Sequence, residues 1–179
     1  MREATAWIID LGHGLHAALG SSELAHLISD PTLFEMPQTP SYCRHLVMWE
    51  GAMVPVLDLA FWLLGEPAER AESFVAVVGY QEQPADAPQH GALLTAGIPD
   101  RVRVCDEQAC DLAPRPFGWR HVACSCFMHN NEPIPILDLP FLFSREAGLG
   151  DLIEDVHRRI DGNGAQVSSH FATAQARRA

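Results

Sequence analysis

Alternating apolar and polar positions along the chain predict a protein built mainly of short β-strands. Five candidate strands are rich in Val, Ile, Leu and aromatic residues and lie between turn-forming residues: 5–10, 15–19, 73–80, 92–97 and 101–105. The stretch Phe74–Val78 is apolar without interruption, which predicts burial on both faces of its strand. We therefore expect a mainly all-β fold.

A gapless repeat, offset by eighty residues, organises the rest of the pattern. The segment Val54–Phe61 returns as Ile134–Phe141, and the apolar residues before it match as well. Both copies read as a strand, a two-residue turn, a second strand and a short helix that begins after Asp. The turns Glu50-Gly51 and Asn130-Asn131 contain Gly or Asn, which tolerate the positive φ angles of tight hairpins. The repeat predicts two similar small β subdomains within residues 1–144.

Short helices and a linker are predicted between the strands. A Ser cap and helical spacing of Leu24, Leu27 and Ile28 predict a helix over 22–28. A second helix is expected over Leu59–Leu64, because Gly65 follows at the position that favours a helix end. The polar residues 66–72 are the expected hinge between the two halves.

The C-terminal segment has a different pattern. Apolar residues between Leu149 and Ile160 recur at helical spacing, and Gly162 follows them. This predicts an amphipathic helix within 145–163. Residues 164–179 are small, polar and unpatterned, so we expect a disordered tail.

The charge balance restricts the class of partner. The net charge is −11, and residues 1–144 carry all of it, with 18 acids against 7 arginines. Such a surface repels phosphate backbones, so we do not expect a nucleic-acid partner. The N-terminus lacks the profile of a secretion signal, and no apolar run approaches the ~20 residues of a membrane helix. The five cysteines, an odd number, fit reduced thiols in a cytoplasmic protein without membrane insertion.

Asp58 and Asp138 occupy equivalent places in the repeat and resemble a pair of catalytic carboxylates. Each directly precedes a short helix, where a carboxylate caps free backbone N–H groups. Leu-Ala and Leu-Pro follow them, instead of the small hydroxyl and glycine residues that an aspartic-protease dyad requires. We therefore predict two helix caps and no catalytic residues.

Cysteine and histidine cluster in the second half of the chain and leave a second class of function open. A metal- or redox-sensing protein could use the donors Cys105, Cys110, Cys124, Cys126 and His129. Against a metal site, Cys124 and Cys126 alternate along a strand, and the C-x₂-C spacing of zinc knuckles is absent from the sequence. A small-molecule-binding β-barrel is a third possibility, which a large apolar pocket with converging polar groups would support.

Trp49 lies at the tip of the first hairpin, beside Glu50. A large aromatic residue exposed at a turn more often marks a contact site than a core. This position is our first candidate for a partner-binding surface.

The pattern from residue 36 to residue 65 resembles the CheW-like domain, the adaptor module of bacterial chemosensory systems. A Pro-containing crossing (36–42) leads to an apolar strand, the turn glycine Gly51, the segment Val54–Leu59 and the helix end Leu63–Gly65. The resemblance covers roughly residues 5–143 and is most specific over 54–65. It implies two five-stranded, SH3-like β-barrels with short helices, without catalytic activity, cofactor or metal. It also implies binding to the regulatory domain of a chemosensory histidine kinase, to methyl-accepting chemoreceptors, or to both.

Several positions differ from the family pattern. Glu50 stands where the family usually has Arg, Met48 where Asn is common, His45 in place of a small Gly, and Ala96 in place of an Asp. The Arg-bearing turn of the family belongs to the surface that meets the kinase. We therefore expect a divergent adaptor of a chemotaxis, pilus-motility or other chemosensory pathway. Its expected partner-binding residues are His45, Met48, Trp49, Glu50 and Gly51.

Overall fold

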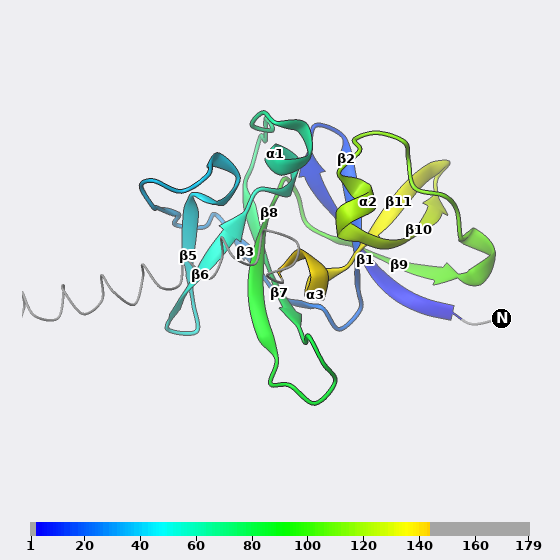
Figure 1. Cartoon of the computed structure of the whole chain (residues 1–179), viewed down its shortest axis with the longest axis horizontal. Coiled ribbons are helices and arrows are strands. Elements are labelled where there is room, and N and C mark those ends of the chain that lie inside the picture. The colour runs from blue at the N-terminus through cyan, green and yellow to red at the C-terminus, as the bar shows by residue number, and fades with distance from the viewer. Residues whose placement is uncertain (1–2, 144–179) are drawn as a thin grey trace, which may run out of the picture.

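The computed structural model describes residues 3–143, which form two curved β-sheets that each roll into a small barrel (Figure 1). The first sheet contains β1 (Glu3–Gly12), β2 (Leu15–Gly20), β9 (Asp100–Cys105), β10 (Ala123–His129) and β11 (Glu132–Leu137). The second contains β3 (Leu24–Ser29), β4 (Phe34–Glu35), β5 (His45–Trp49), β6 (Ala52–Leu57), β7 (Phe74–Tyr80) and β8 (Gln89–Thr95). The mainly all-β fold with two barrels is as expected, although one sheet has six strands, because the two-residue β4 adds to its edge.

The two sheets have the same strand order. The five-stranded sheet runs β10–β11–β2–β1–β9, and the six-stranded sheet runs β5–β6–β8–β7–β3 with β4 beyond β5. In each, the second strand of the repeated hairpin pairs in parallel with a strand from the other half: Val56 with Ala92, and Ile136 with Ala18. Val56 and Ile136 are eighty residues apart, so the sequence repeat and the strand pairing coincide.

Neither half of the sequence builds a barrel alone. The first half of the sequence contributes β1 and β2 to the five-stranded sheet and β3–β6 to the six-stranded sheet. The second half contributes β7 and β8 to the six-stranded sheet and β9–β11 to the five-stranded sheet. Each half thus contributes its leading hairpin, β1–β2 or β7–β8, to the barrel that contains the repeated hairpin of the other half. The connector 66–72, the predicted hinge, lies between two elements of the six-stranded sheet, and the chain passes from sheet to sheet at 20–24 and 95–100.

The repeated hairpins share their backbone geometry. Both residues of each turn have positive φ, 48° and 79° at Glu50 and Gly51 and 50° and 65° at Asn130 and Asn131. Positive φ at both central positions matches the right-handed twist of the flanking strands. The predicted equivalence of the two hairpins is therefore present in the fold.

Short helices follow each hairpin. Helix α1 (Leu59–Leu64) is capped by Asp58 and ends at Gly65, whose φ is 79°, as the sequence predicted. Helix α3 (Leu139–Leu142) is capped by Asp138 in the same way. Helix α2 (Trp119–Val122) was not predicted, because four residues are too few to show helical periodicity. Two 3₁₀ turns, η1 (Ser41–Cys43) and η2 (Asp106–Gln108), complete the elements of the described chain.

The helix predicted over 22–28 is wrong, because this segment is strand β3. Leu24 pairs with Val78 and His26 with Val77 of β7, so Ala25 is the extra residue of a β-bulge. A bulge interrupts the two-residue alternation of a strand. The apolar residues Leu24, Leu27 and Ile28 consequently fall at a spacing that mimics a helix.

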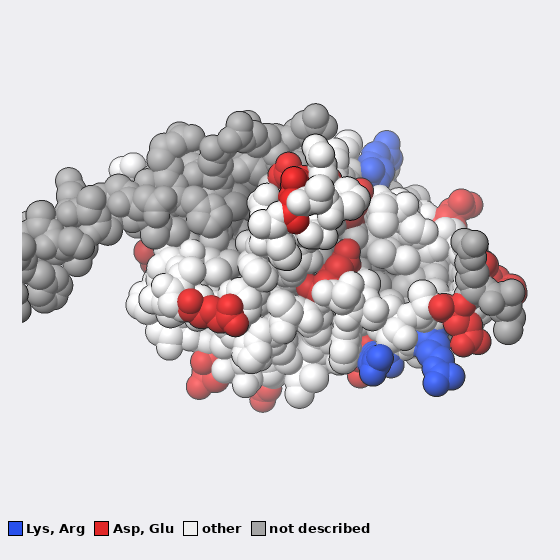
Figure 2. All heavy atoms as spheres, turned by 90° about the horizontal axis from the view of Figure 1, so that it is seen from below, with Lys and Arg blue, Asp and Glu red and all other residues white. Residues whose placement is uncertain are grey.

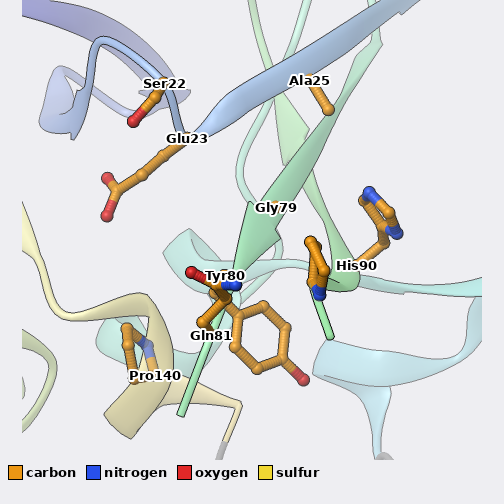
Figure 3. A pocket seen from close by; sticks show the side chains of 9 residues that line it. Ser22, Glu23, Ala25, Gly79, Tyr80, Gln81, His90 and Pro140 are labelled. Atoms are coloured by element: carbon orange, nitrogen blue, oxygen red, sulfur yellow. The ribbon is translucent and has the colours of Figure 1, made fainter. Parts of the chain in front are cut away.

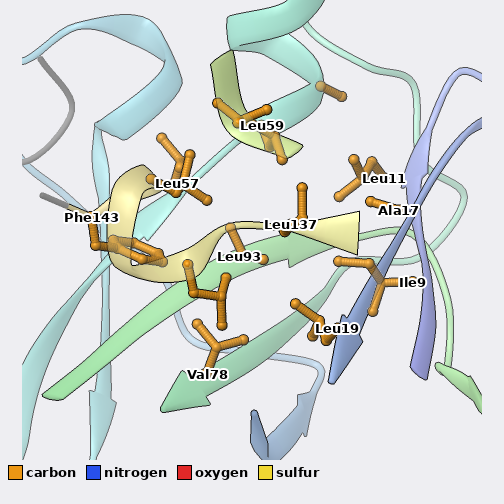
Figure 4. Packing of buried hydrophobic residues seen from close by; sticks show 14 of the residues in the cluster. Ile9, Leu11, Ala17, Leu19, Leu57, Leu59, Val78, Leu93, Leu137 and Phe143 are labelled. Atoms are coloured by element: carbon orange, nitrogen blue, oxygen red, sulfur yellow. The ribbon is translucent and has the colours of Figure 1, made fainter. Parts of the chain in front are cut away.

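Three clusters of buried side chains hold the fold together. One fills the six-stranded barrel and includes Val54 and Val75, and another fills the five-stranded barrel around Phe127. The largest lies between the sheets and takes residues from both sheets and from all three helices (Figure 4). Burial of a large aliphatic side chain contributes about 1.5–3 kcal/mol, so this shared cluster is the main attraction between the barrels.

The predicted C-terminal helix within 145–163 and the predicted disordered tail at 164–179 lie outside the described residues. Within the described part of the chain, no helix has the length and apolar character needed to cross a membrane.

Gly91 of β8 offers a test of how α3 is anchored on the six-stranded sheet. The ring of Phe143, which stacks on Tyr80, lies 2.5 Å from the position that a Cβ atom at Gly91 would take. We expect Gly91→Ala to displace this ring and to lower the free energy of unfolding by roughly 1–3 kcal/mol. Gly97→Ala is the matched control, because apart from Gly97 and its two chain neighbours no described residue has an atom within 4 Å of the point that the new Cβ would occupy. Urea denaturation should separate the variants, and equal stabilities would contradict this anchoring.

The exchanged hairpins predict that the halves of the chain depend on each other. Separately expressed fragments 1–72 and 73–179 should not fold, because each lacks strands of both barrels. Expressed together, they should co-purify and recover the β-sheet circular dichroism of the intact chain. A cooperative thermal transition in either isolated fragment would contradict the expectation.

Candidate functional site

The predicted partner-binding residues all lie on the β5–β6 hairpin, but they do not form one cluster. Met48, Trp49, Glu50 and Gly51 are consecutive and make the tip. His45 begins β5 and pairs with Val56, about 16 Å along the strand from Glu50 at ~3.3 Å per residue. The candidate surface is therefore the hairpin tip, residues 48–51, and His45 is separate from it.

The turn presents Glu50 to solvent in a left-handed conformation. Glu50 is exposed, and no ion pair of the described residues involves it. Its φ of 48° is uncommon for a residue with a Cβ and costs about 1 kcal/mol or more. The equivalent turn of the second hairpin places Asn130 in the same conformation without charge. The two turns thus share a shape and differ in electrostatics.

An exposed apolar face adjoins the tip. Met48 is 53% exposed and Phe34 of β4 is 46% exposed. Phe34 lies directly opposite Leu46, and Leu46 and Met48 share a face of β5 because side chains alternate along a strand. Nothing in the sequence singled out Phe34, since β4 is only two residues long and lies in a crossing rich in proline. Together, Phe34, Met48 and residues 49–51 form what we term the tip surface.

Trp49 is less exposed than its position at a turn predicted. It is half-buried, packs against the cluster inside the six-stranded barrel, and its ring lies 4.6 Å from that of His90 of β8. This contact fixes the hairpin tip on the sheet. Trp49 accordingly orients the tip surface and offers only part of its ring to a partner.

The surroundings of His45 favour its neutral form. Burial lowers the pKa of its imidazole, the positive charge of Arg44 lowers it further, and Glu35 and Asp58 oppose these effects. A depressed histidine pKa means that the unfolded chain binds more protons than the folded one. His45 therefore stabilises the fold at pH values above the pKa that its imidazole has in the unfolded chain. This stabilisation is lost as the pH falls through the lower pKa that the imidazole has in the folded chain.

A groove of about 470 Å³ runs between β3, β7, β8 and α3, where the two sheets meet (Figure 3). Its walls include Glu23, Tyr80, His90 and Pro140. Burial raises the pKa of the Glu23 carboxyl, a hydrogen bond from the Gly20 N–H opposes this, and the charge of Asp138 adds to it. Side chains fill the six-stranded barrel, and a hollow of about 410 Å³ on the five-stranded sheet, lined among others by Val104, Phe127 and Ile136, is open to solvent. Neither barrel of the described chain therefore provides the enclosed apolar pocket of a small-molecule carrier.

Charge is unevenly spread over the described surface. In Figure 2, acidic side chains occur across the face, and the arginines visible there lie in the right-hand half. Arg101 and Arg103 belong to β9 of the five-stranded sheet, and the rings of Trp7 and Phe117 accept cation–π contacts from Arg101 and Arg120. On the six-stranded barrel the exposed Arg44 pairs with Glu35, whereas Glu50 at the hairpin tip has no ion pair among the described residues.

Asp58 and Asp138 cap separate helices, as predicted. The Asp58 carboxylate accepts a hydrogen bond from the Phe61 N–H at 3.0 Å, and Asp138 accepts one from Phe141 at 3.0 Å. No hydrogen bond or ion pair of the described residues joins the two carboxylates. Their arrangement gives no acid–base dyad.

Arg70 gives Asp58 a second role that the sequence analysis missed. Its guanidinium binds the Asp58 carboxylate through two nitrogens, at 2.7 and 3.0 Å, and donates a further bond to the Leu11 carbonyl at 2.7 Å. The side chains of Arg70 and Asp58 are only 6% and 14% exposed. Arg70 therefore joins the α1 cap to β1 of the other sheet. Asp58 and Arg70 are twelve residues apart in the sequence, and no motif at that spacing identifies the pair.

The candidate metal donors do not converge. Within residues 3–143, no group of three or more His, Cys, Asp and Glu side chains could hold a metal ion. Cys124 lies against the Ile136 carbonyl and Cys105 against the Gln108 amide, whereas Cys110 and Cys126 contact each other. The metal-sensing alternative has no site in this part of the chain.

Comparison with known proteins places these features in a family. The family model described as the CheW-like domain matches residues 5–147. The crystal structure of the scaffolding protein TtCheW from Thermoanaerobacter tengcongensis is similar in fold, with a TM-score of 0.63 and 16% sequence identity. The match covers 80% of this chain and 90% of that one. No curated protein sequence matches the chain.

The Asp58–Arg70 pair can be tested against its repeat-related position. Asparagine caps a helix nearly as well as aspartate, so Asp58→Asn removes the charge and keeps the cap. We expect a loss of roughly 3–5 kcal/mol, because the Arg70 guanidinium remains buried without a counter-charge. Asp138→Asn, where no ion pair of the described residues is lost, should change the stability by less than about 0.5 kcal/mol. Urea denaturation midpoints give both values, and similar losses in the two variants would show that Asp58 acts only as a cap.

Proposed function

Because the chain belongs to the CheW-like domain family, whose members are non-catalytic scaffolding adaptors, we propose that it couples chemoreceptors to a histidine kinase in a bacterial chemosensory system. The observation that carries the proposal is the family match over 5–147, which spans both barrels and both repeated hairpins. The chain is not an enzyme, and the proposed role needs no cofactor. The proposed place of action is the cytoplasm, where kinases of this class and the signalling ends of their receptors lie.

The two barrels suit an adaptor that holds two proteins at once. Each barrel has its own hairpin and its own cluster of buried side chains, and the large shared cluster fixes the barrels to each other. We assign the kinase contact to the six-stranded barrel through the tip surface. The remaining barrel and the groove at the sheet junction are then available for the receptor.

The tip surface combines the two features of a specific contact. Met48 and Phe34 supply exposed apolar area, which is worth about 25 cal/mol for each Å² removed from water. Glu50 supplies a charge at the rim, where complementary electrostatics determine the choice of partner more than the affinity. A partner of this chain should therefore present an apolar patch beside a basic residue.

Glu50 favours a pathway different from that of standard family members. A kinase surface that meets the family's usual Arg presents an acid, and Glu50 would place two like charges together there. The cognate kinase should instead carry a basic residue at this point. A pilus-motility or other non-flagellar system with its own kinase fits this requirement.

Reversal of the charge at Glu50 tests the proposed contact. Glu50→Arg should weaken binding to the cognate kinase regulatory domain by about tenfold or more, since a like-charge contact at an interface costs several kcal/mol. The same change should strengthen binding to a standard chemotaxis kinase. Isothermal titration calorimetry with both purified regulatory domains measures the two effects.

Asn130→Arg provides the matched control, because Asn130 has the same left-handed turn geometry in the other barrel. It should leave kinase affinity unchanged. If both turn variants bind both kinases like the natural chain, the tip surface is not the kinase contact. If the natural chain binds neither a kinase regulatory domain nor a receptor signalling fragment, the adaptor proposal itself fails.

A further inference from the structure

The seam of the five-stranded barrel is closed by a short segment and not by a strand. β9 and β10 lie at opposite edges of the sheet, and residues 106–112 run between them. Ala109 forms an antiparallel bridge with Phe127, the Cys110 N–H donates to the Cys126 carbonyl at 3.1 Å, and the Gln108 side-chain amide donates to the Met128 carbonyl at 3.1 Å. Few interactions therefore hold the barrel shut at this point.

Two thiols face each other across this seam. Cys110 lies directly opposite Cys126, in register with the Ala109–Phe127 bridge, and their Sγ atoms are 3.4 Å apart. Hydrogen-bonded residues at opposite positions of antiparallel strands have Cα atoms roughly 5.5 Å apart, which lies within the range of disulfide bonds. The other thiols of the described chain contact carbonyl or amide oxygens or are buried singly.

We propose that Cys110 and Cys126 are a peroxide-sensitive pair, which hydrogen peroxide converts into a disulfide that closes the five-stranded barrel covalently. The site is independent of the tip surface and of the adaptor role. Reduction by a small thiol or a dithiol protein restores the two thiols.

The reaction proceeds in two balanced steps. The Cys110 thiolate attacks one oxygen of hydrogen peroxide, the O–O bond breaks, and the departing hydroxide takes a proton to leave as water, which leaves Cys110 as a sulfenic acid. The Cys126 sulfur then attacks the Cys110 sulfur, the S–O bond breaks, and hydroxide leaves with the Cys126 proton as a second water. Two thiols lose two electrons in total, and the peroxide gains them.

The environments of the two sulfurs fix this order. Cys126 is 3% exposed, and burial, its hydrogen bond with Cys110 and the nearby charges of Cys110 and Asp111 raise its pKa to about 12. Cys126 is therefore less readily ionised than a free thiol and less accessible to peroxide than Cys110. Cys110 is half-buried and reaches solvent, so it meets the oxidant first, and Cys126 is already in place to resolve the sulfenic acid.

Intact-mass spectrometry of the full chain tests the proposal. Reduced protein, freed of reductant, is treated with an equimolar amount of hydrogen peroxide and blocked with an alkylating agent. We expect a product that is lighter than the reduced chain by two hydrogen atoms, and a peptide map under non-reducing conditions that links residues 110 and 126. Cys110→Ser should abolish the linked product, whereas the double variant Cys105→Ser, Cys124→Ser should form it like the natural chain.

Two further measurements do not need Cys126 variants, in which the change of a buried side chain would disturb folding. The oxidised chain should melt roughly 5–10 °C above the reduced chain, since the link constrains a short loop of the unfolded state. Amide hydrogen exchange at 106–112 should slow on oxidation. A product that is only heavier by oxygen atoms, a link through another cysteine, or a dimer joined between chains would overturn the proposal.

Discussion

The reciprocal exchange of hairpins is the constraint on which the rest of the structure depends. A barrel of either kind is complete only when the leading hairpin of one sequence half pairs in parallel with the repeated hairpin of the other half. Each of these parallel contacts is short: Val56 and Leu57 pair with β8, and Ile136 pairs with Ala18 of β2. Parallel pairing alone is a weak attachment, so the exchange has to be secured by the packing between the sheets. The largest cluster of buried side chains lies at that interface and provides this attachment.

Arg70 supplements the apolar interface with a polar contact that has a defined geometry. A buried guanidinium is costly to desolvate, and it is tolerated here because two carboxylate oxygens and a carbonyl receive its N–H groups. Its Nε atom has no hydrogen-bond partner among residues 3–143, which limits the net gain. The pair also has a positional role. It fixes where the connector crosses, and Gly12, with a φ of 91°, allows the connector to pass within contact distance of the β1–β2 turn.

Local chemistry was predictable from the sequence, and contacts between distant strands were not. A few neighbouring residues determine each hairpin turn, each helix cap and the end of α1 at Gly65. The tip of the first hairpin could be located from the sequence because it is one of these turns. Strand β3 was missed because a bulge at Ala25 gives its apolar residues helical spacing. The exchange of hairpins, the exposed Phe34 beside the tip and the packing of Trp49 on His90 depend on which strands lie side by side, which a single sequence does not record.

The two passages of the chain between the sheets have a mechanical consequence. The backbone crosses from one barrel to the other at 20–24 and again at 95–100, and the Arg70 contact adds a third link at the connector. Two bodies that are joined by three links and share a filled core have little freedom to rotate against each other. The Arg70 contact opposes motion at the connector 66–72, where the sequence predicts a hinge. In the proposed adaptor role, proteins bound to the two barrels would be held at a fixed mutual angle, and a signal would pass as a change of orientation of the whole unit.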